Sequence, residues 1–166
     1  MGFFQNIFGN GNKEEIIPIC APVAGKLVPL SEVSDPTFSD GILGQGAAVI
    51  PTDNQFFSPV DGTVNTVFPT GHAAALTSAD GVEVLLHIGL DTVKLNGKHF
   101  TIHVEEGQQV KKGDLLLEAD LEQIKAEGFD TITPVIVCNT EEFSEIMMAR
   151  GSKVAVGDTI INIRKG

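Results

Sequence analysis

Apolar and polar residues alternate over short stretches along most of the chain, and turn residues interrupt them at short intervals. In a sequence rich in Val, Ile and Thr, such alternation is typical of β-strands that bury one face. It predicts strands within GILGQGAAVIP (41–51), HAAALTSA (72–79) and VEVLLHIG (82–89), among others. The pattern therefore predicts an all-β protein, an antiparallel β-sandwich of barrel-like character with short helical elements.

Helical patterns are confined to two short stretches. LEQIKAEG (121–128) has the composition of a helix that ends at a glycine. EEFSEIMMAR (141–150) is predicted as a second helix, with Thr140 as its N-cap and Gly151 at its end. Because both are short, we expect sheets to form the core.

Two pairs of similar segments indicate an internal duplication. APVAGKLVPL (21–30) resembles SPVDGTVNTV (58–67), since each places a Pro-x-x-Gly turn before a short strand. VEEGQQVKKGDLLLEAD (104–120) and ARGSKVAVGDTIINIRK (149–165) share the frame Gly-x-x-Val-x-x-Gly-Asp. The copies are too far apart for stacked repeats, so we expect two related half-units in one fold.

The first residues differ from the rest of the chain. Four apolar side chains there have the spacing of one helix face, and Gly-Asn-Gly-Asn follows as a hinge. The apolar residues are Phe3, Phe4, Ile7 and Phe8. The sequence predicts a flexible, amphipathic tail over residues 1–14 and a single domain over 15–166.

Composition excludes several classes of function. The chain has 22 acidic and 11 basic residues and a formal charge of −11, which disfavours nucleic acid and anionic lipid and suits basic partners. No secretion signal or membrane-length apolar run is present, so a cytoplasmic location is expected. Cys20 and Cys138 lack CxxC spacing, and we expect two reduced, buried thiols.

One histidine, His87, interrupts an apolar strand, and a second, His72, precedes it by one predicted hairpin. Asp80-Gly81 is the strongest hairpin signal in the chain and predicts a two-residue type I′ turn. That turn would place His72 opposite Gly89, with His87 as its diagonal neighbour on the same face.

Two neutral imidazoles in an apolar setting suit phosphoryl transfer. One nitrogen can attack phosphorus while the other ring donates a hydrogen bond to a phosphoryl oxygen. Thr70, two residues before His72, is placed to hold the far nitrogen of that ring.

Two other interpretations of the pair stay open. The histidines can be satisfied core residues, or they can supply half of a zinc site. His99 and His103, in KHFTIHVEE, are separated by four positions on an extended segment, and we expect them to be exposed.

GVEVLLHIGLDTV (81–93) resembles the phosphorylation-site signature of the glucose-type enzyme IIA family of the bacterial phosphoenolpyruvate-dependent sugar phosphotransferase system. That signature is Gly, two variable residues, three aliphatics, His, an aliphatic, Gly, an aliphatic, a variable residue, Thr and an aliphatic. Every position is filled here, and the resemblance extends from about residue 15 to the end. It implies an antiparallel β-sandwich built by duplication.

The resemblance also implies roles for individual residues. His87 would accept the phosphoryl group on the nitrogen remote from the backbone, His72 would stabilise that group, and Thr70 would orient His72. Asp35 and Asp91 match acidic positions that face a basic donor. A hydrophobic ring around the site is matched by Phe38, Ile42, Leu43, Phe68, Leu85 and Val93.

Within that family the carrier HPr gives the phosphoryl group to enzyme IIA, which passes it to a cysteine of enzyme IIB during sugar uptake. The resemblance therefore implies HPr and enzyme IIB as partners, peripheral contact with the membrane permease, further regulatory targets and no cofactor or metal.

Three rival functions are weighed against this one. Lipoyl- and biotinyl-carrier domains share PVxGxV and EGxxVxxGDxL, but they present a lysine at a hairpin tip, where this chain has Ala79-Asp80-Gly81. A zinc endopeptidase of related fold would need a His-x-His element, which this sequence lacks. A purely regulatory binding protein would not need an intact pair of His72 and His87.

Overall fold

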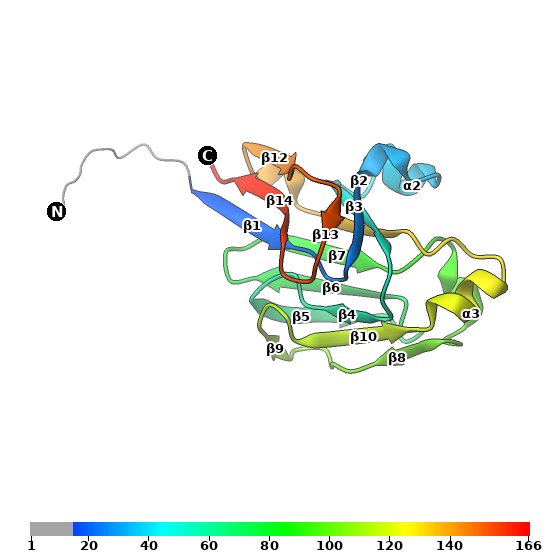
Figure 1. Ribbon diagram of the computed structural model, residues 1–166. Coiled ribbons are helices and arrows are strands. Elements are labelled where there is room, and N and C mark those ends of the chain that lie inside the picture. The colour runs from blue at the N-terminus through cyan, green and yellow to red at the C-terminus, as the bar shows by residue number, and fades with distance from the viewer. Residues whose placement is uncertain (1–14) are drawn as a thin grey trace, which may run out of the picture.

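Short antiparallel strands make up most of the structure, a computed structural model that describes residues 15–166 (Figure 1). The strands are β1 (Ile16–Cys20), β2 (Gly25–Pro29), β3 (Gln45–Pro51), β4 (Gln55–Phe57), β5 (Gly62–Val67), β6 (Ala73–Ser78), β7 (Glu83–His87), β8 (Phe100–Ile102), β9 (Gln109–Val110), β10 (Leu115–Ala119), β11 (Thr133–Val137), β12 (Glu145–Met148), β13 (Lys153–Val154) and β14 (Thr159–Arg164). The helical elements are η1 (Leu30–Glu32), α2 (Pro36–Ser39), η2 (Thr92–Leu95), α3 (Leu121–Ala126) and η3 (Thr140–Glu142). The tail predicted over residues 1–14 lies outside the described residues.

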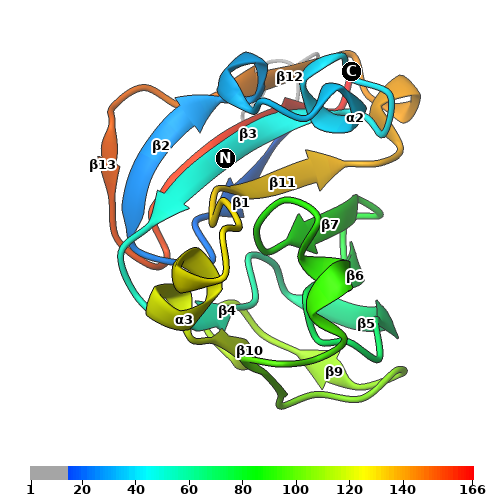
Figure 2. The same ribbon diagram turned by 90° about the vertical axis from the view of Figure 1, so that its right-hand side faces the viewer.

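The strands form one large sheet and two small ones. The large sheet has the order β13-β2-β3-β11-β7-β6-β5-β9, and the three-stranded sheets are β1-β14-β12 and β4-β10-β8. Figure 2 shows the large sheet curving from β2 and β3 through β11 to β7, β6 and β5. The prediction of an all-β antiparallel sandwich is confirmed.

The main hydrophobic core lies between the inner face of the large sheet and the two small sheets. Its fully buried members include Ile19, Leu76, Leu86, Leu117 and Ile161, which come from five different strands. A second, smaller cluster lies on the outer face and contains Val28, Val33, Phe38, Ala48, Leu90, Ile132 and Ile136. The loop that carries η1 and α2 therefore covers part of the outer face.

The duplication seen in the sequence is present in the strand pairing. Gly25 of β2 lies opposite Val154 of β13, and Gly62 of β5 lies opposite Val110 of β9. These four residues hold equivalent positions in the two copies of the Pro-x-x-Gly and Gly-Asp motifs. Each half of the fold therefore joins its two motifs through the same contact.

The correspondence continues into the centre of the large sheet. Because β2 pairs with β3 as β5 pairs with β6, β3 corresponds to β6. In the same way β11, which pairs with β3, corresponds to β7, which pairs with β6. Val135 of β11 then corresponds to Leu86 of β7, and these two residues are paired with each other. An approximate two-fold axis therefore passes between β11 and β7.

The hairpin between β6 and β7 differs from the predicted type I′ turn. The Ser78 amide donates to the Val82 carbonyl at 2.8 Å, and the Gly81 amide donates to the Ser78 carbonyl at 2.9 Å. In this turn only Gly81 has a positive φ, of 85°, whereas type I′ would also require one at Asp80. The loop is therefore a three-residue turn with glycine in the left-handed position, and it shifts the strand register by one residue.

The prediction of a helix over residues 141–150 is wrong. Only η3 forms near its start, and the following residues form β12, which pairs with β14 by placing Ile146 opposite Ile163. Thr140 does not cap a helix, because its hydroxyl donates to the Val137 carbonyl at 2.7 Å. Hydrogen bonding to β14 and packing of Ile146 on the main core override the local helical composition. The helix predicted over 121–128 is confirmed as α3.

Two further expectations were tested by the structure. Cys20 and Cys138 are both free thiols, but only Cys20 is buried, because Cys138 follows the last residue of β11 and is exposed. None of the helices within residues 15–166 has the length and apolar character needed to cross a membrane.

The packing predicts a large loss of stability when Leu86 is shortened. Leu86 lies beside the approximate two-fold axis and has no exposed surface. Leu86→Ala should reduce the free energy of unfolding by about 2–5 kcal/mol, because it leaves a cavity in the core. Urea denaturation measures this change. Ile102→Ala is the control, since Ile102 is 40% exposed and its loss should cost far less. Equal losses in the two variants would contradict the assigned core.

Candidate functional site

The two predicted histidines meet at one end of the β6–β7 hairpin. Their ring centroids are 5.0 Å apart, and the rings are nearly perpendicular at 80°. His87 is the last residue of β7 and is half-buried, whereas His72 precedes β6 and is only 3% exposed. The structure thus brings together an accessible imidazole and a buried one.

The histidines meet, but not in the predicted register. Ala73 lies opposite His87, and the Ile88 amide donates to the His72 carbonyl at 2.7 Å, so His72 does not lie opposite Gly89. Strict alternation in this register would place the two histidines on opposite faces. His72 lies outside β6, where the chain leaves the turn of residues 68–71, and its ring is therefore free of that alternation.

A backbone carbonyl fixes the chemistry of His87. Its Nδ1 lies 2.8 Å from the Gly89 carbonyl oxygen. Since a carbonyl only accepts, Nδ1 carries the hydrogen and Nε2 of neutral His87 keeps its lone pair. Gly89 has a φ of 78°, and an added Cβ would lie 2.6 Å from the Thr92 methyl group. Sequence reasoning missed this carbonyl as a partner, although the glycine belongs to the signature.

His72 is held on several sides. Its Nδ1 lies 2.6 Å from the Thr70 hydroxyl, the contact expected from the sequence. Phe68 packs against the ring edge-on at a centroid distance of 5.3 Å, and Phe100 lies 6.5 Å away. Phe100 comes from β8, and no local pattern had linked it to the histidines. The Nδ1 atoms of both histidines are thus occupied, whereas within residues 15–166 neither Nε2 atom is held by a hydrogen bond.

Burial controls the ionisation of both rings. Removal from water, with a smaller effect from neighbouring His87, lowers the pKa of His72 from 6.5 to about 4. Burial also lowers the pKa of His87, while the Gly89 carbonyl, Asp35 and Asp91 act in the opposite direction. Both imidazoles are therefore neutral near pH 7, the state in which a ring nitrogen can act as a nucleophile.

The residues predicted for a hydrophobic ring divide into two groups. Phe38 is buried and packs on His87 at a centroid distance of 5.0 Å, and Leu85 packs on the smaller core cluster. The exposed members are Ile42 at 70%, Leu43 at 37%, Phe68 at 38% and Val93 at 49%. Of these six residues, Phe38 and Phe68 contact the two histidine rings.

The two predicted acidic residues lie on the loops beside His87. Asp35 caps α2 by accepting from the Thr37 amide at 3.0 Å, and Asp91 precedes η2 with a φ of 59°. Both carboxylates act electrostatically on His87. With Lys94 and Asp130 they line a surface depression beside the site.

The remaining histidines lie away from the pair. His103 is exposed and contacts Glu118 at 2.8 Å, whereas His99 is only 18% exposed in its side chain and contacts Glu127. The expectation that both are exposed is therefore wrong for His99. Within residues 15–166 no group of three or more His, Cys, Asp or Glu side chains is arranged to hold a metal ion.

Comparison with known proteins reveals close similarity to one family. Its model, described as phosphoenolpyruvate-dependent sugar phosphotransferase system, EIIA 1, matches residues 17–143. The PTS system glucose-specific EIIA component of Haemophilus influenzae is 38% identical, over 99% of this chain and 100% of that protein. The glucose permease IIA structure from Mycoplasma capricolum superimposes with a TM-score of 0.84 at 34% identity, covering 98% of this chain and 99% of that one.

Longer proteins are also similar. The PTS system beta-glucoside-specific EIIBCA component of Halalkalibacterium halodurans is 45% identical over 95% of this chain but only 24% of its own length. The chain thus spans about a quarter of the length of the EIIBCA relatives it matches.

The low pKa of His72 predicts a specific pH dependence of stability. The unfolded chain binds a proton on this residue near pH 6.5, but the folded chain does so only near pH 4. The free energy of unfolding therefore includes a contribution of roughly 3 kcal/mol from neutral His72. This contribution is fully present above pH 6.5 and is lost as the pH falls to about 4. Urea denaturation across this range should show a shallower pH dependence in His72→Gln. Identical pH profiles for the variant and the unmodified protein would exclude a buried neutral His72.

Proposed function

The chain belongs to the EIIA 1 family of the phosphoenolpyruvate-dependent sugar phosphotransferase system, and we propose that its histidine pair carries the phosphoryl group in that system. As a family member it is a phosphotransferase component. We propose phospho-HPr as the donor, a cysteine of enzyme IIB as the acceptor, and the cytoplasm as the location.

The hydrogen bond between His87 Nδ1 and the Gly89 carbonyl is the observation that carries the proposal. It leaves the Nε2 lone pair of His87 as the nucleophile. Attack on the phosphohistidine of HPr forms a new N–P bond as the donor's N–P bond breaks, and the donor imidazole leaves with that electron pair. In the second step the enzyme IIB cysteine attacks phosphorus, and His87 Nε2 is the leaving group.

His72 is proposed to stabilise the transferring group. When the Thr70 hydroxyl donates to Nδ1, the proton of neutral His72 resides on Nε2. That N–H then donates to a phosphoryl oxygen as negative charge develops. The low pKa of His72 keeps the ring neutral, and the role of Thr70 is to select this tautomer.

The surroundings of the pair suit successive partners. Phe68 packs on His72 and is partly exposed, and the proposed docking face also includes the exposed apolar side chains of Ile42, Leu43 and Val93. Asp35 and Asp91 supply negative charge for a basic donor. HPr and enzyme IIB must both reach Nε2 of His87, so we propose that they bind this face in turn. Relatives that carry EIIB and EIIC in the same protein support enzyme IIB and a permease as partners.

The carrier-domain alternative has no support in the hairpin tip, which is Ala79-Asp80-Gly81 without a lysine. A purely regulatory protein of this fold would not become phosphorylated. Incubation with enzyme I, HPr and phosphoenolpyruvate, described next, therefore also tests the regulatory alternative.

Phosphorylation is expected on His87 alone among the four histidines. Incubation with phosphoenolpyruvate, enzyme I and HPr should add one phosphoryl group that is labile in acid and stable in base. Intact mass measurement should show the gain in the unmodified chain and none in His87→Ala, because the nucleophile is absent. Persistence of the gain in that variant would disprove the assignment.

His72→Gln is expected to separate the two half-reactions. Glutamine keeps an N–H donor but cannot share a proton as an imidazole does. His87 should still accept the phosphoryl group, while transfer to the enzyme IIB cysteine slows by roughly 10²–10³, as is typical after loss of one preorganised donor. Rapid-quench measurement follows both steps. Complete loss of acceptance, or no effect on either step, would contradict the proposed division of roles.

A further inference from the structure

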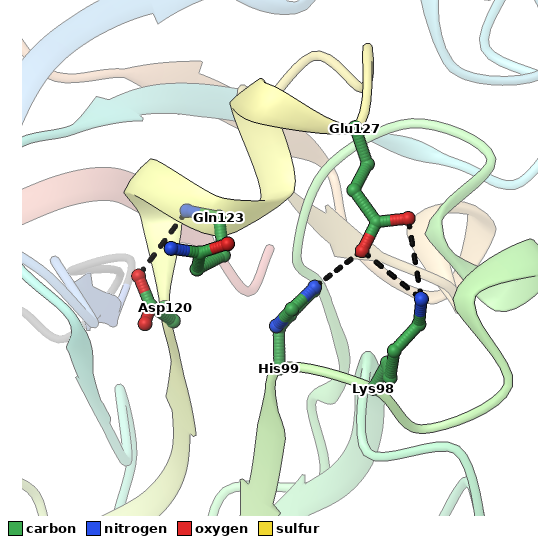
Figure 3. A network of polar contacts seen from close by, with 5 residues as sticks. All are labelled: Lys98, His99, Asp120, Gln123 and Glu127. Atoms are coloured by element: carbon green, nitrogen blue, oxygen red, sulfur yellow. Dashed lines mark hydrogen bonds and ion pairs between the residues drawn. The ribbon is translucent and has the colours of Figure 1, made fainter.

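A polar network outside the histidine pair joins α3 to the segment that precedes β8 (Figure 3). Glu127, the residue that ends α3, contacts His99 Nε2 at 2.5 Å and Lys98 Nζ at 3.2 Å. His99 has a φ of 76°, and its carbonyl accepts from the Asp120 amide at 2.9 Å. Side-chain and backbone contacts thus hold His99 in an unusual conformation against both ends of α3.

The backbone that follows Glu127 supports His87. The Asp130 carbonyl accepts from the Leu90 amide at 3.0 Å, and the Ile132 carbonyl accepts from the Gly89 amide at 3.1 Å. These bonds hold the peptide units around Gly89, whose carbonyl binds His87 Nδ1. The direction of the His87 ring therefore depends on the path of the chain just beyond α3.

A second set of contacts leads from the Glu127 side chain to His72. Glu127 holds His99, and Phe100, which follows His99, packs edge-on against the His72 ring at a centroid distance of 6.5 Å. Phe100 also lies close to Gly71, where an added Cβ would be 2.9 Å from the Phe100 Cβ. A shift of His99 would consequently move Phe100 against the turn that carries His72.

We propose that Glu127 is a positioning residue for the phosphoryl-transfer site. Its side chain fixes the end of α3 and so the path of the chain to Asp130 and Ile132, which support His87, and it acts on His72 through His99 and Phe100. The transfer part of this proposal rests on the proposed function, whereas its effect on the two rings does not. Among the described residues Glu127 has no hydrogen bond to either histidine of the pair, and its side chain holds Lys98 and His99 instead.

The test uses the full chain with two readouts. One is the rate of transfer from phospho-HPr to His87, and the other is the imidazole ¹⁵N resonances of His72 and His87. Glu127→Ala should lower the rate about tenfold and shift the resonances of His72, because a small displacement of supporting groups weakens catalysis strongly. Glu127→Gln should restore most of the rate, since its amide oxygen can still accept from His99.

Two further variants make the test specific. His99→Asn suits a positive φ but is too short to hold Glu127, so it should reproduce the effect of Glu127→Ala even if the latter fails to fold. Glu118→Ala is the control. Glu118 lies on β10 and makes a comparable contact with His103 at 2.8 Å, so its loss should change neither readout.

The outcomes separate the two proposals. Unchanged rates and resonances in Glu127→Ala and His99→Asn, or equal effects in Glu118→Ala, would overturn the positioning role. If the unmodified chain accepts no phosphoryl group, the proposed function fails. The resonances of His72 then decide alone whether Glu127 positions the ring.

Discussion

The hydrogen bond from His87 Nδ1 to the Gly89 carbonyl is the constraint on which the proposed chemistry depends. It selects the tautomer of His87 and points a lone pair away from the backbone. The carbonyl reaches the ring because Gly89 takes a φ of 78° immediately after β7. A side chain at this position would collide with Thr92 and with the Asp130 carbonyl, so the same close packing that fixes the carbonyl also requires glycine.

The duplicated fold explains where this constraint arises. His87 lies one residue from Leu86, beside the approximate two-fold axis between β7 and β11. The position equivalent to His87 in the other half is Ile136, which belongs to the outer hydrophobic cluster. One half therefore supplies an apolar support at the place where the other presents the proposed nucleophile. Corresponding loops of the two halves also support the histidines. Phe38, between β2 and β3, packs on His87, and Phe68, between β5 and β6, packs on His72.

The sequence predicted the fold and singled out the histidine pair because both follow from local patterns. Alternation identified the strands, the repeated motifs identified the duplication, and the segment around His87 carried a signature. The register was not predictable in the same way, because an Asp-Gly pair fits both a two-residue turn and the last positions of a three-residue turn. The segment 141–150 has helical composition, and only the presence of β14 beside it decides for a strand.

Other parts of the site were hidden because they are tertiary contacts. Nothing near Phe100 in the sequence indicates that it packs on His72, and nothing near Glu127 indicates that it contacts His99. The meeting of the two histidines also depended on His72 lying outside its strand. The predicted proximity was therefore correct although the register from which it was argued was wrong.

The electrostatic setting of the pair suits a group that must be both accepted and released. Burial keeps both rings neutral, which makes His87 nucleophilic but supplies no positive charge to hold a phosphoryl group. In the proposed reaction Asp35 and Asp91 repel that group further, and the chain as a whole carries a formal charge of −11. Stabilisation by hydrogen bonds from neutral donors, rather than by fixed cations, limits how tightly the site can retain the group. In the proposed reaction a basic donor offsets the repulsion while it is bound, and its departure leaves a phosphoryl group that is readily passed to the next carrier.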